Sequence, residues 1–275
     1  MANVMMKENM NVISKYFTAG LDLQREPVGV RFLVDRQAYD KCKLTPSKSK
    51  LRYCQMVQNA SLGERLKVSL DNFACFAGAR VLGLVEIEEW YRSGSYYNSC
   101  GLYQDRAIAK NVTKNIEKCD HKVLGMEIQP LGQFEEEPDV VILIGNAFQM
   151  MRLVQAYAYK FGFEHSFKSL GNQAMCSECT ASPYMKNGIN LSMLCAGTRE
   201  SGFADDELAL GIVYNQLHSL LDGLCSTVTP VESNMRKKKI LEKSKELGVE
   251  IDLEFNKDYG TPLFKHDCQH FLKKR

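Results

Sequence analysis

Two short segments of the sequence combine a cysteine with one glycine–arginine pattern. They read CFAGARVLG (75–83) and CAGTRESG (195–202), and each contains Ala-Gly-x-Arg-x-x-Gly after its cysteine. A thiolate binds metals and attacks electrophiles, whereas a neighbouring arginine balances negative charge or binds an anionic substrate. Because the pattern occurs twice with a cysteine each time, these segments are the first candidates for a functional site.

Two further cysteines extend the repetition. Cys54 precedes Cys75 by 21 residues, and Cys176 precedes Cys195 by 19. The chain has ten cysteines, which is many for a reducing compartment where structural disulfides are rare, so metal binding or redox chemistry gains weight. Four thiolates suit an iron–sulfur cluster or a structural zinc ion. Zinc usually takes its ligands in close pairs, so this wide spacing favours an iron–sulfur cluster, and we expect the [4Fe-4S] type. The cluster would be held between two halves of a domain.

The segment CSEC (176–179) is the one C-x-x-C pair in the sequence. It makes Cys179 a substitute metal ligand, and it also allows a redox dithiol, although nothing else here resembles the thioredoxin pattern. HDCQH (266–270) could bind a metal weakly, but it lies in a polar tail. Any single cysteine of the chain can instead be a small buried hydrophobic residue.

The repeated pattern also supplies two arginines and four glycines. Arg80 and Arg199 would flank the thiolates, holding a small substrate or balancing charge; the alternative is that they bind carbonyls at a turn. The glycines allow sharp turns and the close approach of a ligand. These are Gly78, Gly83, Gly197 and Gly202. Their spacing matches neither the Walker A nor the Rossmann pattern, so it gives no evidence of nucleotide binding.

The segments before these cysteines repeat as well. PVGVRFLV (27–34) and PDVVILIG (138–145) both begin with proline and read as apolar strands. The shared order of strand, cysteine, second cysteine and glycine turn predicts an internal duplication. We therefore expect an α/β fold of two similar halves packed as one pseudo-symmetric unit. Its parts would be an N-terminal helix (1–26), a first half (27–131), a second half (132–230) and a charged helical appendage (231–275).

Hydrophobic periodicity predicts the individual elements. Helices are expected over 5–22, 53–66, 103–118, 147–162 and 231–248, with a further helix within 206–224. Strands are expected over 27–34, 67–74, 122–131, 138–145 and 188–197. Asn146 is a favourable N-cap for the helix that Gly162 would close.

Composition narrows the classes of partner. The 275 residues carry 35 basic and 33 acidic side chains, so we expect neither nucleic acid nor an anionic membrane as a partner. No run approaches the 18 to 20 apolar residues of a membrane span, and the N-terminus lacks a signal-peptide core, which predicts a cytoplasmic protein. The sequence leaves a homo-oligomer open.

Together, these motifs resemble domain of unknown function family 169, a group of archaeal and anaerobic bacterial proteins. The resemblance rests on PVGVRF, Cys54, CFAGARVLG, PDVVILIGNAFQMMRLVQA, CSECTASPY and CAGTR. It implies an anaerobic setting, which suits an oxygen-sensitive cofactor. We therefore predict a cytoplasmic iron–sulfur protein, a reductase or an electron-transfer component, acting on a small molecule with an electron-donor protein. The alternatives are a zinc-stabilised binding protein and a metal-free protein that binds a small molecule.

Overall fold

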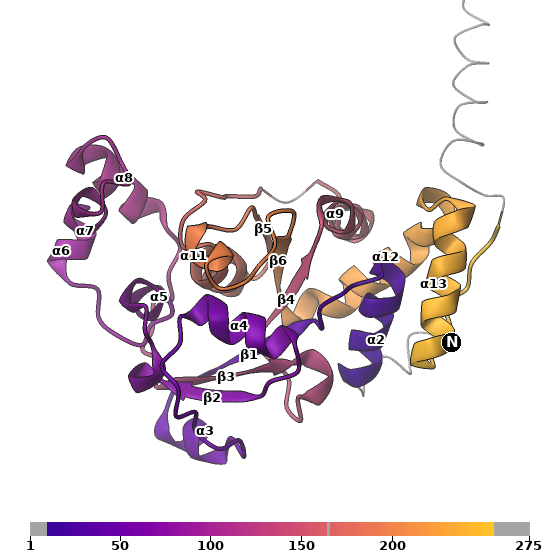
Figure 1. The fold of residues 1–275 in the computed structure, drawn as a ribbon, viewed down its shortest axis with the longest axis horizontal. Helices are drawn as coiled ribbons and strands as arrows, with labels where there is room; N and C mark the ends of the chain where they lie inside the picture. The colour runs from indigo at the N-terminus through magenta and orange to yellow at the C-terminus, as the bar shows by residue number, and fades with distance from the viewer. Residues whose placement is uncertain (1–9, 164–165, 256–275) are drawn as a thin grey trace, which may run out of the picture.

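One six-stranded sheet organises the protein (Figure 1). The computed structural model describes residues 10–163 and 166–255. The strand order is β2-β3-β1-β4-β6-β5, and every neighbouring pair is antiparallel. The strands are β1 (Val28–Leu33), β2 (Leu66–Ser69), β3 (Gly125–Pro130), β4 (Val140–Gly145), β5 (Ile189–Ser192) and β6 (Leu208–Val213). The expected mixture of helices and strands is confirmed, with a single antiparallel sheet.

The strand order is symmetric about the centre of the sheet. On each side, the second strand in the chain lies at the edge, the third lies next to it, and the first lies at the centre. From one edge it runs β2, β3, β1, and from the other it runs β5, β6, β4, so β1 and β4 meet at the centre. Each third strand also passes directly into a short 3₁₀ turn. These turns are η2 (Leu131–Gln133) after β3 and η4 (Tyr214–Gln216) after β6.

Helical segments cover one face of the sheet and form the larger core. Alternate residues of the central strands, such as Val30, Ile142 and Ile144, are buried there against Tyr53 and Met56. The elements on this face include α4 (Tyr53–Ser61), α5 (Phe76–Val81), the π-helical segment η3 (Ala174–Ala181) and α10 (Ser182–Lys186). Each of the two halves expected from the sequence thus contributes helical segments to this face.

The other face is covered by longer helices. Val141 and Leu143, which alternate with the residues of the first core, pack with Phe17, Leu153 and Leu220. The helices concerned are α2 (Met10–Leu21), α9 (Ala147–Phe161) and α12 (Leu217–Val231). A third, smaller cluster joins α2 to α13 (Asn234–Leu247), with Ile240 and Ile251 buried in it. Figure 1 shows α2, α12 and α13 grouped at one end of the molecule.

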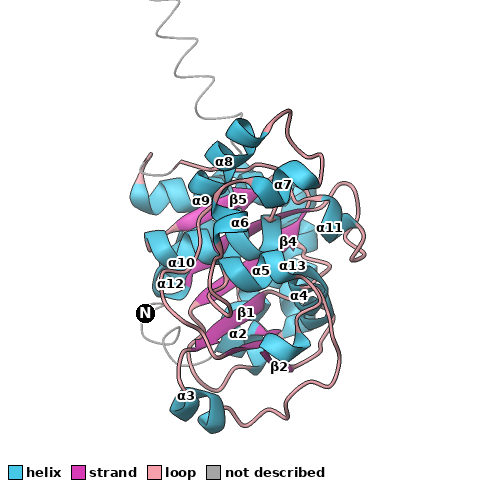
Figure 2. Ribbon diagram, turned by 90° about the vertical axis from the view of Figure 1, so that its left-hand side faces the viewer, coloured by secondary structure: helices cyan, strands magenta, loops and turns pink. Residues whose placement is uncertain are grey.

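Short helices connect β2 to β3 and extend from the sheet. Beyond α5 they are α6 (Glu89–Arg92), α7 (Ser95–Ser99) and α8 (Arg106–Asn115). Figure 2 views the molecule from the side that carries them. Gly94, with φ of +78°, lies at the start of α7, and a Cβ there would lie 2.7 Å from the carbonyl carbon of Ala109. This close approach holds α7 against α8. The remaining short helices are α3 (Arg36–Lys41) and α11 (Ala196–Arg199).

Most of the elements predicted from the sequence are present, with shifted ends. The helix expected over 147–162 is α9, with Asn146 as its N-cap and Gly162 as its C-cap. The strand expected over 67–74 is shorter, because the chain turns into a 3₁₀ helix, η1 (Leu70–Asn72), after β2. The segment 206–224 contains the predicted helix only from Leu217, because its first part forms β6, which the sequence analysis missed. HDCQH lies outside the described residues.

Candidate functional site: a cavity lined by four cysteines

The four repeated cysteines line one cavity. Cys54 lies in the first turn of α4, and Cys75 and Cys195 are the N-cap residues of α5 and α11. Cys176 lies in η3. The cavity has a volume of about 610 Å³, and all four side chains belong to its wall. The prediction that these positions converge in space is therefore consistent with the fold, since four separate segments bring them to the same place.

Each helix cysteine lies against the glycine turn of the other half. Cys54 Sγ lies 3.3 Å from the carbonyl oxygen of Gly197 and 3.0 Å from Ser201 Oγ. In the reciprocal arrangement, Gly78 lies beside Cys176, and a Cβ at the glycine would be in ordinary contact with the sulfur at 3.9 Å. The two Ala-Gly turns thus pack across the boundary between the halves.

Burial is the main cause of the raised thiol pKa values in the cavity, and the neighbouring thiols contribute to them. Burial raises the pKa of Cys176 well above its usual value, and the negative charges of Cys75, Cys195 and Cys54 raise it further. Burial also raises the pKa of Cys54; a hydrogen bond with Ser201 opposes the shift, and the charges of Cys195 and Cys75 add to it. Four thiolates in this place therefore require a positive partner that compensates their mutual repulsion.

The distances between candidate ligands decide which kind of metal site they could form. Within residues 10–163 and 166–255, no three side chains of His, Cys, Asp or Glu form a group that could hold one ion. Thiolates on one zinc ion must all lie about 2.3 Å from the same atom. A cluster separates its ligands further, because each thiolate binds a different iron.

Aromatic side chains line the rest of the cavity. Trp90, Tyr96 and Tyr97 come from α6 and α7, and Tyr53 comes from α4. The rings of Tyr96 and Tyr97 meet edge to face, with 4.9 Å between their centroids. Tyr53 is buried and its hydroxyl lies 2.9 Å from Thr180 Oγ1, which connects α4 to η3. The cavity thus has a thiol-lined part and an aromatic part.

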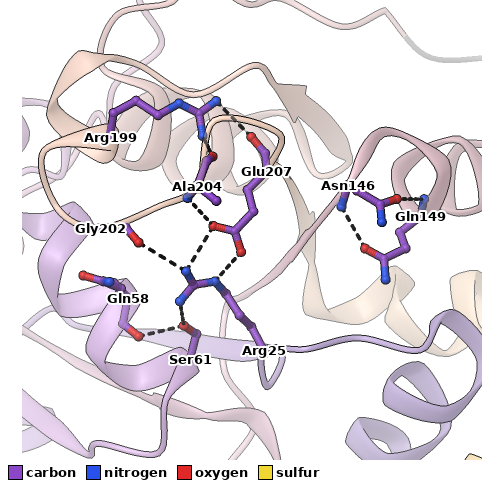
Figure 3. A network of polar contacts seen from close by, with 9 residues as sticks. All are labelled: Arg25, Gln58, Ser61, Asn146, Gln149, Arg199, Gly202, Ala204 and Glu207. Carbon is purple, nitrogen blue, oxygen red and sulfur yellow. Dashed lines mark hydrogen bonds and ion pairs between the residues drawn. The ribbon is translucent and has the colours of Figure 1, made fainter.

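The two repeated arginines lie in different surroundings. Arg80 lines the cavity; its Nε donates to Glu88 Oε2 over 2.8 Å, and its guanidinium lies over the rings of Tyr91 and Tyr96. Arg199 instead donates to backbone carbonyls, including that of Glu207 over 3.0 Å (Figure 3). It borders a shallow hollow beside the N-terminus of α9, separate from the cysteine cavity.

The turn glycines also differ in what they do. Gly83 and Gly202 have φ values of +79° and +95°, a region that side chains rarely adopt. Gly83 packs against the backbone of His121, and Gly202 packs against Gln58. Gly78 and Gly197 line the cavity, and the absence of a side chain leaves room beside the sulfurs.

The second cysteine of CSEC is directed elsewhere. Cys179 is fully buried, and its backbone packs against Gly211 of β6 so closely that a Cβ at the glycine would lie 2.6 Å from the Cys179 carbonyl carbon. Burial raises the pKa of the Cys179 thiol well above its usual value. Cys176 lines the cavity, whereas Cys179 belongs to the core behind it.

The sequence analysis did not select the aromatic residues of the cavity. They come from WYRSGSYYNSCGLY (90–103), a segment left without an assigned role between Gly83 and the helix predicted over 103–118. Five aromatic residues within fourteen positions are the signal that could have drawn attention to it.

Comparison with known proteins agrees with the resemblance drawn from the motifs. The model of domain of unknown function family 169, described as "Uncharacterised ArCR", matches residues 17–223. The chain belongs to this family. The match includes all four cavity cysteines.

One curated relative comes from an archaeon. The protein named Uncharacterized protein MJ0308, from Methanocaldococcus jannaschii, is 26% identical over 176 residues, which are 63% of this chain and 76% of the relative. No solved structure matches the chain. Among the described helices, none combines the length and apolar character needed to cross a bilayer.

Proposed function

We propose that Cys54, Cys75, Cys176 and Cys195 bind one [4Fe-4S] cluster, and that the protein is a cytoplasmic reductase or electron-transfer component. The observation that carries this proposal is that four cysteines from four separate segments line a single cavity. The wide spacing of these cysteines in the sequence favours a cluster over one zinc ion, which usually takes its ligands in close pairs. A bound cluster would supply one-electron transfer, or a Lewis-acidic iron where a coordination position is open.

The wall of the cavity supports a small-molecule substrate beside such a group. Trp90, Tyr96 and Tyr97 offer flat apolar surfaces that exclude water and orient a ring or chain. Arg80 brings one positive charge to the same wall, although Glu88 largely balances it. In this proposal Arg80 partly compensates the negative charge of the thiolates. Arg199 stabilises the turn that carries Cys195, through its hydrogen bonds to backbone carbonyls. Electrons would come from a donor protein.

We further infer that the two halves descend from a duplicated unit. The shared strand order supports this, and so do two matching hydrogen bonds at the ends of the strands. Leu131 N, just after β3, donates to Pro27 O over 2.7 Å, and Tyr214 N, just after β6, donates to Asp139 O over 2.9 Å. Pro27 and Asp139 each precede the first strand of a half.

The register of the central strands supports the same inference. Aligning Pro27 with Asp139 also aligns Gly29 with Val141, and these two residues are Cα partners in the β1–β4 pair. A pseudo-two-fold axis through that pair would relate the helical segments on one face of the sheet, with Cys54 in α4 corresponding to Cys176 in η3. A cluster on this axis would take two ligands from each half.

Metal analysis of the protein and its variants tests the proposal. After purification without oxygen, iron, sulfide and zinc are measured for the wild type and for single Cys→Ser variants of the four cavity cysteines. We expect about four irons and four sulfides per chain in the wild type. Each of the four variants should lose iron, because a hydroxyl is a poorer ligand for iron than a thiolate.

Cys42→Ser and Cys225→Ser are the matched controls, since both residues lie outside the cavity wall. They should keep their iron. Full iron content in the four cavity variants, or a wild type without iron after cluster reconstitution, would overturn the cluster. Zinc at one ion per chain would support the zinc-stabilised alternative. A metal-free protein would also overturn the cluster, and would leave the cavity as a site for an organic ligand that contacts the aromatic wall.

A further inference from the structure

A separate cavity lies away from the four cysteines, where α2, the end of β4, the start of α9 and α13 meet. Its volume is about 470 Å³, and its wall shares no residue with that of the cysteine cavity. Figure 3 shows part of this wall, with Arg25 and Glu207 on one side and Asn146 and Gln149 on the other. Arg25 binds both carboxylate oxygens of Glu207, at 2.5 and 3.0 Å. The charges of these two side chains therefore balance each other.

The N-terminus of α9 forms the opposite wall. Asn146 Oδ1 accepts a hydrogen bond from Gln149 N over 3.1 Å, and Gln149 Oε1 accepts one from Asn146 N over 2.8 Å. Gln149 Nε2 then donates to the carbonyl oxygen of Leu21, which ties α9 to the end of α2. The side-chain oxygens of both residues and Gln149 Nε2 are already hydrogen-bonded, so these groups shape the cavity rather than recognise a ligand.

Glu232 supplies a buried carboxylate oxygen that has no partner. The residue is 2% exposed, and its Oε1 accepts from Nε of the fully buried Arg152 over 2.7 Å. Its Oε2 is buried, and in the part of the chain that the structure describes it makes no hydrogen bond. Glu232 belongs to the wall of the cavity. A buried, unpaired carboxylate oxygen is costly unless a donor reaches it, so this atom calls for an N–H or O–H group from a ligand.

Two cations lie close by on α13. Arg236 and Lys239 both line the cavity, and neither forms an ion pair among the described residues. Arg236 lies 3.6 Å over the ring of Phe148 at the start of α9. They supply positive charge to the cavity wall, and the positive end of the α9 helix dipole adds to it.

The positions of the two kinds of charge limit the ligand. Glu232 contacts α9 at Arg152, and Arg236 contacts it at Phe148, one helical turn away. Four residues of α-helix span about 6 Å. A ligand that engages both places therefore carries a positive and a negative group only a few bonds apart. Apolar side chains also line the cavity, namely Leu21, Ile144, Phe148, Met235 and Ile240.

We propose that this cavity binds a free apolar α-amino acid, with its ammonium group on Glu232 Oε2 and its carboxylate on Arg236 and Lys239. The apolar side chain of the ligand would contact Leu21, Ile144 and Met235. The proposal does not depend on a cluster, because the two cavities have separate walls and separate charged groups.

Calorimetric titration of the full-length protein tests the proposal. The probes are L-leucine, L-methionine and L-phenylalanine. For leucine, the matched analogues are 3-methylbutan-1-amine, which lacks the carboxylate, and 4-methylpentanoic acid, which lacks the amine. We expect at least one amino acid to bind with a Kd below about 1 mM, and each analogue to bind about tenfold or more weakly, since each loses one charge-assisted contact.

Variants assign the contacts. Glu232→Gln and the double variant Arg236→Ala/Lys239→Ala should each weaken binding about tenfold or more. Lys238→Ala, an exposed neighbour outside the cavity wall, should bind like the wild type. If Glu232→Gln does not fold because Arg152 is left unpaired, the double variant and the comparison of leucine with its two analogues test the proposal instead. Absence of binding by all three amino acids, equal binding of the amine, or unchanged binding in the double variant overturns the proposal.

Discussion

Replacing Gly211 by alanine is expected to destabilise the protein more than any ordinary glycine substitution in a strand. Gly211 lies in β6, directly beneath η3. A Cβ at this position would lie 2.6 Å from the carbonyl carbon of Cys179 and 2.8 Å from its Cα. Carbon atoms in contact prefer about 3.5–4.0 Å, so the backbone of η3 must move by about 1 Å to admit one methyl group.

The magnitude follows from the nature of the obstacle. Overpacking a core usually costs about 1–3 kcal/mol, and we expect the upper end because backbone, not a flexible side chain, occupies the space. For a chain of this size, about 3 kcal/mol lowers Tm by about 6–12 °C. η3 also carries Cys176, so its displacement should reach the wall of the cysteine cavity.

Gly188→Ala is the matched control, because a Cβ there would lie 3.8 Å from the nearest atom, Lys186 O. We expect this variant to stay within about 1 kcal/mol of the wild type. Differential scanning calorimetry and urea titration of the wild type and both variants provide the measurement. If Gly211→Ala unfolds at the temperature of the wild type, the close packing of β6 against η3 described here is wrong.

Three further predictions concern single contacts. Asn146→Ala removes the cap that accepts from Gln149 N and should cost about 1 kcal/mol in urea titration, whereas the same change at the exposed Asn111 should cost little. Tyr53→Phe removes the hydroxyl that lies 2.9 Å from Thr180 Oγ1 and should lower the free energy of unfolding by about 1 kcal/mol. Unchanged stability would show that this contact between α4 and η3 does not stabilise the fold. Burial raises the pKa of Glu207, but hydrogen bonds from Arg25 and Ala204 N lower it on balance. Its charge therefore stabilises the fold above the unfolded pKa of about 4.3, and the contribution is lost as the pH falls through the lower folded pKa. Glu207→Gln should accordingly lower Tm at pH 7, and the difference from the wild type should shrink as the pH falls below about 4; a constant difference at all pH values would contradict this assignment.

The sequence identified the cavity cysteines because their surroundings repeat. Cys54 and Cys176 follow the first strand of each half, and Cys75 and Cys195 follow the second strand, so the order of elements alone brings them to one side of the sheet. Arg80 and Arg199 share the same motif, yet Arg80 lines the cavity and Arg199 binds carbonyls of its own loop. The repeated motif predicts the turn of the backbone at both places. The direction of each guanidinium depends instead on the residues around it, which differ between the two places.

Other features depended on tertiary contacts that a pattern does not contain. The apolar run LALGIV (208–213) fits a buried strand or a helix equally well, and only pairing with β4 and β5 decides for the strand. The direction of Cys179 follows from the π-helical winding of η3, whose wider turn places residues three apart on different sides. Trp90 and Tyr97 reach the cavity because α6 and α7 fold back toward it, which no local periodicity predicts.

The central position of β1 has a consequence for the protein during its synthesis. β1 ends at Leu33, but its two partners, β3 and β4, begin at Gly125 and Val140. At about 5–20 residues per second, roughly 100 residues of further translation take about 5–20 s. During that time both edges of β1 are unpaired, because neither β3 nor β4 has been made. This apolar strand would therefore be the segment that a chaperone at the ribosome exit binds.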